Sequence, residues 1–149
     1  SNLLENIKYI AKDSDGNEYV IKAEKGEIDL NNSDVIFLEN VVSLIKLNNS
    51  DKINITSDFG KYNASNYDTI FSKNVVITYL DNHITGEYLD FSLEKNIMTI
   101  SRNIIFTNLD NILKADVIEL NISTKDTKIF MYEENKKVKL KTKIKNGYN

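Results

Sequence analysis

Apolar and polar residues alternate along most of the chain, a period typical of β-strands with one buried face. The segment at 21–30, IKAEKGEIDL, shows this alternation, and similar segments recur at 53–64 and 83–93. β-Branched residues are abundant, and Asn, Asp and Ser gather between the alternating segments, where they favour turns. The pattern predicts an all-β fold over most of the chain.

The alternating segments form an internal repeat of four copies, which align without gaps. Their first residues are Ile21, Ile55, Ile84 and Leu113. A small residue stands two positions later and an acid follows it: Ala23, Ser57, Gly86 and Ala115, then Glu24, Asp58, Glu87 and Asp116. Two larger columns come next: Ile28, Tyr62, Phe91 and Leu120, then Phe37, Phe71, Ile100 and Ile129. We expect the acids to face solvent and to contact Lys22 or turn amides.

Each copy predicts the same order of elements. A first strand leads into a polar turn, and a second strand carries the Phe/Ile column. A bend at Asn40, Asn74 or Asn103 precedes a third apolar stretch, and the fourth copy has Tyr132 instead. The first nine residues are compatible with a short helix or a lead-in, and residues 9–23 predict a hairpin that turns at 15–16, Asp-Gly.

One such unit cannot bury its apolar face alone, so stacked units are expected to share a core. Two facing sheets would enclose a slot lined by the repeated columns. The small column has two interpretations, which are close packing of the facing sheet and room for an internal groove. We expect one domain at 7–145, a lead-in or linker remnant at 1–6 and a tail at 146–149.

A stack of strands has two edges with unpaired backbone groups, to which another chain can add a strand. The C-terminal segment at 136–145, KKVKLKTKIK, alternates Lys with apolar residues and Thr. Its lysines have three interpretations: protection of an edge against aggregation, selection of an acidic or polar partner strand, and attraction to anionic lipid. The predicted partner edge consists of Val138, Leu140, Thr142 and Ile144.

Composition narrows the possible functions by exclusion. The 149 residues are 41% hydrophobic and 28% charged, as in a globular domain, and the net charge of −3 gives no attraction to nucleic acid. Cysteine and proline are absent, so disulfides are excluded and no strand is interrupted. No apolar run is long enough to cross a membrane, and SNLLENIKYI lacks the features of a signal peptide. The leading Ser-Asn is compatible with a cloning scar on a piece of a longer protein.

Candidate catalytic and metal-binding residues are few. His83 is the only histidine and falls in a predicted turn. The segment at 13–18, DSDGNE, begins like a calcium loop but continues as a predicted strand. We therefore predict no enzymatic activity, no metal and no cofactor.

The repeated segments resemble the LptC family and, more broadly, the LptA/OstA β-jellyroll superfamily. The resemblance covers about 7–145 and is carried by DSDGNEYVIKAEKGEIDL, VIFLENVVSLI, INITSDFGKYNASNYDTIFSKNVVITY and ITGEYLDFSLEKNIMTISRNI. It implies an open, twisted antiparallel β-jellyroll of roughly fifteen strands. It also implies a periplasmic location and a tether to the inner membrane through an N-terminal helix outside this sequence.

The function implied by the resemblance is that of a bridge component in lipopolysaccharide transport in Gram-negative outer-membrane biogenesis. The chain would receive lipopolysaccharide from the inner-membrane ABC transporter, docked at its N-terminal edge. It would pass the lipid to an LptA-like bridge protein at its C-terminal edge. An apolar groove would hold the acyl chains of lipid A, because each buried CH₂ contributes about 0.8 kcal/mol.

The predicted lipid-binding groove joins the inward columns with four residues that follow the bends. It consists of Ile21, Ala23, Ile28, Phe37, Ile55, Ser57, Tyr62, Phe71, Val75, Ile77, Ile84, Gly86, Phe91, Ile100, Ile104, Phe106, Leu113, Ala115, Leu120 and Ile129. Two other functions compete with lipid transport. One is a structural β-solenoid that polymerises by its edges and has a packed interior without ligand. The other is a carbohydrate-binding or hydrolytic β-protein with an aromatic or carboxylate cluster on an exposed face.

Overall fold

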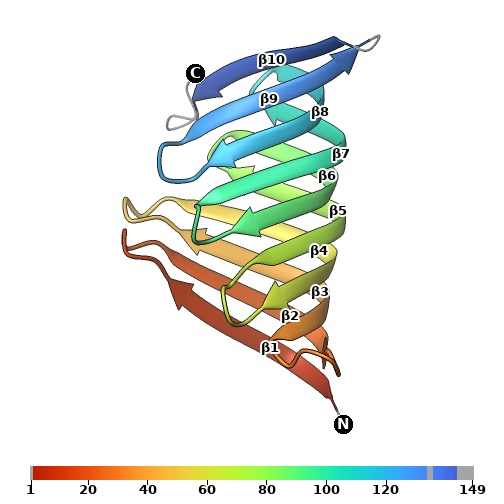
Figure 1. The fold of residues 1–149 in the computed structure, drawn as a ribbon. Helices are drawn as coiled ribbons and strands as arrows, with labels where there is room; N and C mark the ends of the chain where they lie inside the picture. The colour runs from red at the N-terminus through yellow and green to blue at the C-terminus, as the bar shows by residue number, and fades with distance from the viewer. Residues whose placement is uncertain (1, 134–135, 144–149) are drawn as a thin grey trace.

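The fold is a single antiparallel sheet whose strands follow one another in chain order (Figure 1). The computed structural model describes residues 2–133 and 136–143, and side chains as far as Met131. The strands are β1 (Leu3–Lys12), β2 (Glu18–Ile28), β3 (Val35–Lys46), β4 (Lys52–Asn63), β5 (Thr69–Tyr79), β6 (Asn82–Ser92), β7 (Ile97–Asn108), β8 (Asn111–Asn121), β9 (Asp126–Glu133) and β10 (Lys136–Lys143). Within these described residues there is no helix that could cross a membrane.

The N-terminal hairpin confirms one prediction and corrects another. The chain turns at 14–16, where Gly16 has a φ of 86°, so the predicted Asp-Gly turn is confirmed. The alternative of a short helix in the first nine residues is wrong, because Leu3–Lys12 form β1 and pair with β2. Buried Ile7, half-buried Tyr9 and buried Ala11 alternate with exposed residues, and this period of two suits a strand and not a helix.

A crease runs across the strands and folds the sheet into two layers, so that the strands turn back on themselves in Figure 1. Asn6, Asn40, Asn74 and Asn103 lie at the crease with φ between 50 and 54°. Asn tolerates this left-handed conformation better than most residues. Layer A contains 3–5, 25–28, 35–39, 59–63, 69–72, 88–92, 97–101 and 117–121, with β9 and β10. Layer B contains 7–12, 18–23, 41–46, 52–57, 75–79, 82–86, 104–108 and 111–115.

The crease explains why the described part has ten strands and not the roughly fifteen that the resemblance implied. The predicted second and third apolar stretches of each copy belong to one strand, as in Val35–Lys46. The predicted bend at Asn40, Asn74 and Asn103 is confirmed, but it lies within a strand and does not separate two. The all-β prediction and the open β-jellyroll are also confirmed.

The geometry of the crease decides which residues point inward. In β5 both Lys73 and Asn74 have positive φ, and the buried positions on either side are Phe71 and Val75. In β3 only Asn40 has positive φ, and the adjacent buried positions are Leu38 and Val41. The first copy is therefore out of phase with the others before the crease.

Phe37 is a prediction that this difference overturns. The repeat alignment placed it in the inward column, but its side chain is 45% exposed on the outer face of layer A. Leu38, its neighbour, takes the inward position and is 2% exposed.

Candidate lipid-binding interior

The space between the layers is apolar and uncharged. The buried hydrophobic side chains form one cluster that extends from β1 to β9. The polar side chains buried among the described residues are Asn, Ser and Thr, with no Asp, Glu, Lys or Arg. Because an unpaired charge is costly to bury, this interior suits hydrocarbon and excludes sugar–phosphate groups.

Most of the predicted groove residues lie in this interior. The buried ones are Ile21, Ala23, Ile55, Ser57, Tyr62, Phe71, Val75, Ile77, Ile84, Gly86, Phe91, Ile100, Ile104, Phe106, Leu120 and Ile129. Ile28, Leu113 and Ala115 are half-buried and pack against the cluster, whereas Phe37 is exposed. Burial places these side chains but does not test lipid binding, which stays a prediction.

The small column lies next to the crease, where the layers converge. A Cβ added at Gly86 would come within 3.1 Å of Ile100 Cγ2, so there is no spare room at this position. The Ser57 hydroxyl donates to the carbonyl of Phe59 at 2.8 Å, within its own strand. At Gly86 the structure therefore favours close packing over the alternative of a groove.

The acid column positions the crease from outside. The Asn40 side-chain amide donates to Glu24 Oε2 at 2.7 Å, and the Asn74 amide donates to Asp58 Oδ2 at 2.7 Å. The acids face outward as expected, but the expected partners, Lys22 or turn amides, are wrong for these two. Each bond joins neighbouring strands at the crease, where both strands change direction.

Aromatic side chains connect the layers at the N-terminal end of the interior. The rings of Tyr9 and Tyr62 stack with centroids 4.9 Å apart, and those of Tyr19 and Phe91 meet edge to face at 4.9 Å. In each pair the first ring belongs to layer B and the second to layer A. We call these four residues the aromatic cluster.

A buried hydrogen bond supports the aromatic cluster. The Tyr19 hydroxyl of layer B donates to Thr69 Oγ1 of layer A at 2.8 Å. Burial raises the pKa of Tyr62 to about 12, with smaller contributions from Tyr67 and Tyr9, and burial also raises the pKa of Tyr19. Both phenols are neutral at physiological pH. The groove prediction omitted Tyr9 and Tyr19, although the alternation along β1 and β2 contains the signal for both.

The C-terminal end of the interior is built differently. β9 pairs with only Val117–Leu120 of β8, so layer A continues to β9 and β10 while layer B ends at β8 in the described part. Leu113 and Ala115 on that last strand of layer B are half-buried. Thr127 Oγ1 is fully buried and has no hydrogen-bond partner among the described residues.

Surface depressions lie on the outer faces of both layers. Another depression, of about 320 Å³, lies among turns opposite the crease and is lined by Asn17, Asn48 and Ser123, among others. Between the layers the buried side chains form one packed cluster, so an acyl chain would enter only if the layers moved apart.

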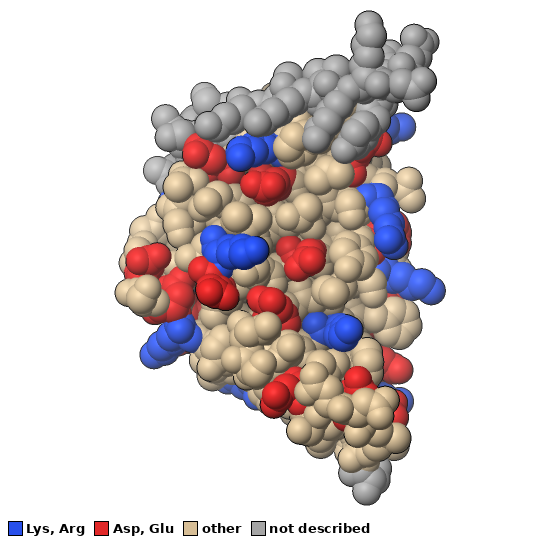
Figure 2. Space-filling model, viewed as in Figure 1, with Lys and Arg blue, Asp and Glu red and all other residues tan. Residues whose placement is uncertain are grey.

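A depression of about 470 Å³ on the outer face of layer A contains aromatic residues that the sequence analysis did not group. Phe37, Phe59 and Tyr88 line it. A cation lies over each ring, at 6.0 Å for Lys61 on Phe37, 5.7 Å for Lys73 on Phe59 and 4.9 Å for Arg102 on Tyr88. The face seen in Figure 2 carries acidic and basic side chains interspersed.

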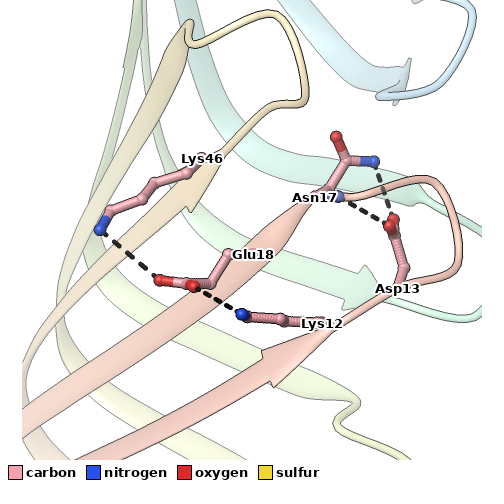
Figure 3. A network of polar contacts seen from close by, with 5 residues as sticks. All are labelled: Lys12, Asp13, Asn17, Glu18 and Lys46. Carbon is pink, nitrogen blue, oxygen red and sulfur yellow. Dashed lines mark hydrogen bonds and ion pairs between the residues drawn. The ribbon is translucent and has the colours of Figure 1, made fainter.

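The segment that began like a calcium loop has a structural role in the hairpin. Asp13 Oδ1 accepts from the backbone N–H groups of Asp15 and Asn17, at 3.0 and 2.9 Å, and Oδ2 accepts from the Asn17 amide at 2.8 Å (Figure 3). Within the described ranges no group of three or more His, Cys, Asp or Glu side chains is placed to hold a metal.

The predicted partner edge lies on the last described strand of the sheet. Val138, Leu140 and Thr142 belong to β10, which pairs with β9 and ends the strand order. Ile144 lies outside the described residues. Partner binding at this edge stays a prediction.

Comparison with known proteins adds one finding. A family model described as lipopolysaccharide-assembly, LptC-related, matches residues 2–149. No curated protein matches the chain.

Proposed function

Because the chain belongs to the LptC-related family of lipopolysaccharide assembly, we propose that it is a lipid-carrying bridge component whose interior takes up acyl chains. The family acts in lipopolysaccharide transport, in the periplasm and bound to the inner membrane. We also propose that an N-terminal helix, outside this sequence, tethers the chain to the inner membrane.

The observation that carries the proposal is the long apolar interior without a buried charge. Transfer of each CH₂ from water into such an environment contributes about 0.8 kcal/mol, so acyl chains can be held without polar contacts. The attraction is non-directional, and a lipid that must move along the interior therefore meets no specific bond to break.

The C-terminal end is where we place the opening for the acyl chains. At the N-terminal end the aromatic cluster and the bond from Tyr19 to Thr69 join the layers. At the other end the half-buried side chains that pack against the cluster include Leu113, Ala115 and Met131, and none of these three carries a ring or a hydroxyl. Separation of the layers there costs dispersion contacts and apolar burial, both of which an inserted chain restores.

The partners follow from the same geometry. We propose that the inner-membrane ABC transporter docks at the edge formed by β1 and that an LptA-like protein adds to the edge formed by β10. Both edges offer backbone hydrogen-bonding groups to a new strand, a recognition mode that continues the sheet from one protein into the next. The interiors of adjoining jellyrolls would then be aligned.

Photo-crosslinking tests lipid carriage at neighbouring positions that face opposite sides of β8. A photoreactive phenylalanine replaces Leu113, which faces the interior, or Lys114, which faces solvent, in cells that make labelled lipopolysaccharide. We expect a labelled adduct at Leu113 and none at Lys114. Adducts at neither position in a folded and localised protein would support the ligand-free scaffold, and adducts at Lys114 alone would place the lipid outside the interior.

A further inference from the structure

The outer face of layer B carries a basic and apolar surface across β1 to β4. Pairing of the strands arranges its side chains in three parallel rows. The first row is Lys12, Glu18, Lys46 and Lys52; the second is Ile10, Val20, Leu44 and Asn54; the third is Lys8, Lys22, Val42 and Thr56. We call these twelve residues the lysine-framed patch, because an apolar row lies between two rows that contain lysine.

The patch has a charge opposite in sign to that of the whole chain. Its five lysines and one glutamate give +4 (5 − 1), whereas the chain has a net charge of −3. Lys8 lies directly opposite Lys22, and Lys46 lies directly opposite Lys52. Like charges in such cross-strand pairs are destabilising, so the arrangement costs stability unless an anion is bound.

The single acid of the patch compensates only part of this charge. Glu18 lies between two lysines, with Oε2 3.7 Å from Lys12 Nζ and Oε1 3.5 Å from Lys46 Nζ (Figure 3). The pair of Lys8 and Lys22 instead borders a hollow of about 480 Å³. Glu24 also lines this hollow, but its carboxylate accepts the Asn40 amide at 2.7 Å.

Two apolar side chains of the patch are exposed beside the lysines. Ile10 is 52% exposed, and Val42, in the third row, is 53% exposed. Of the other apolar side chains in the middle row, Leu44 is half-buried and Val20 is buried. Apolar side chains flanked by lysines are the arrangement by which amphipathic surfaces bind the boundary between headgroups and acyl chains.

Protection of a sheet edge does not explain the lysines. Lysine on an edge strand protects against aggregation, but β1 is the only edge strand among the four strands of the patch. Lys22, Lys46 and Lys52 lie on β2, β3 and β4, which are paired on both sides.

The same face changes character further along the sheet. The outward positions of layer B from β5 to β8 are Val76, Thr78, His83, Thr85, Ile105, Thr107, Ile112 and Lys114. They contain one lysine, Lys114, so most of the positive charge on this face lies on β1 to β4.

We propose that the lysine-framed patch docks the jellyroll on the surface of an anionic lipid bilayer. The proposal goes beyond lipid carriage, because it concerns the outer face and sets how the domain lies against the membrane. It rests on the complementarity between the +4 patch and anionic headgroups and on the exposed side chains of Ile10 and Val42 beside the lysines. Each lysine near such a surface strengthens partitioning by about five-fold.

Vesicle flotation of the whole chain tests the proposal. The probes are vesicles of phosphatidylcholine and vesicles of phosphatidylcholine with phosphatidylglycerol, free of lipopolysaccharide. We expect binding to the anionic vesicles only, weakened by salt. Lys8→Gln with Lys22→Gln should reduce partitioning about thirty-fold, and Lys46→Gln with Lys52→Gln should do so similarly.

The matched control removes two exposed lysines from the outer face of layer A. Lys25→Gln with Lys61→Gln makes the same change in net charge, and we expect its partitioning to fall much less. Equal loss in the control, equal binding to both kinds of vesicle, or no binding of the unmodified chain would overturn the proposal. The last result would point to an acidic protein partner.

The two proposals fail separately. If the patch does not bind membranes, the adduct at Leu113 is unaffected. If lipid carriage is wrong, vesicle binding by the patch is unaffected.

Discussion

The two ends of the interior are closed in different ways. At the N-terminal end, two ring pairs and one buried hydrogen bond join the layers. At the C-terminal end, half-buried Leu113 and Ala115 lie where layer A extends beyond layer B in the described part. Our proposal that acyl chains enter at the C-terminal end rests on this difference.

Two threonines show the contrast at a single repeat position. Thr69 and Thr127 occupy the same column and are both 0% exposed. Thr69 accepts the hydroxyl of Tyr19, whereas Thr127 Oγ1 has no partner among the described residues. Tyr19 belongs to the N-terminal hairpin, which precedes the first copy, so no later copy brings an equivalent ring.

The largest expected effect comes from removing a ring of the aromatic cluster. Phe91→Ala should lower the free energy of unfolding by about 3–5 kcal/mol, because the change removes buried surface and leaves a cavity. Leu113→Ala, at the half-buried end, should cost clearly less. Urea unfolding of both variants measures the difference, and equal costs would mean that the two ends are equally packed.

Replacing either threonine with valine, which has the same shape, should change the stability less, and we expect different results at the two positions. Thr69→Val removes the acceptor for Tyr19 and should cost about 1–3 kcal/mol, because a buried hydroxyl loses its partner. Thr127→Val should leave stability unchanged or raise it, since that hydroxyl has no partner among the described residues to lose. Thermal unfolding of the pair is the measurement, and a matching loss at Thr127 would reveal a bond at the C-terminal end.

Alkaline titration should reveal the aromatic cluster as well. Burial raises the pKa of Tyr62 from 10.0 to about 12 in the folded protein. Above pH 10 the unfolded state releases this proton first, so the stability is complete below pH 10 and falls as the pH rises towards 12. The stability of the Tyr62→Phe variant should fall less steeply between pH 10 and 12. An unchanged slope in this variant would mean that other groups cause the loss of stability.

The sequence predicted the repeat, the bends and most of the buried positions, because strand alternation and Asn in the left-handed region are local properties. It placed Phe37 inward because the alignment assumed equal crease geometry in every copy, whereas β3 has one residue of positive φ where β5 has two. This is a property of backbone conformation that residue types alone do not determine.

Contacts between the layers were harder to predict, because they also depend on backbone geometry that residue types alone do not determine. The stacking of Tyr9 on Tyr62 depends on how far the layers twist against each other, and no spacing in the chain encodes that angle. The hydrogen bond between Asn40 and Glu24 could have been predicted, since the acid column and the Asn column recur together in the repeat. Their pairing becomes evident only in the structure, where β2 and β3 bend at the same point.

Spin-label distances at the two ends test most directly whether acyl chains enter at the C-terminal end, away from the aromatic cluster. The chain has no cysteine, so labels can be attached at chosen pairs of introduced cysteines. Lys114 with Lys128 reports on the C-terminal end, and Ile10 with Asp90, beside Tyr9 and Phe91, reports on the aromatic cluster. On addition of lipopolysaccharide we predict that the first distance increases and the second does not. An unchanged first distance with lipopolysaccharide bound, or equal changes at both ends, would contradict this account.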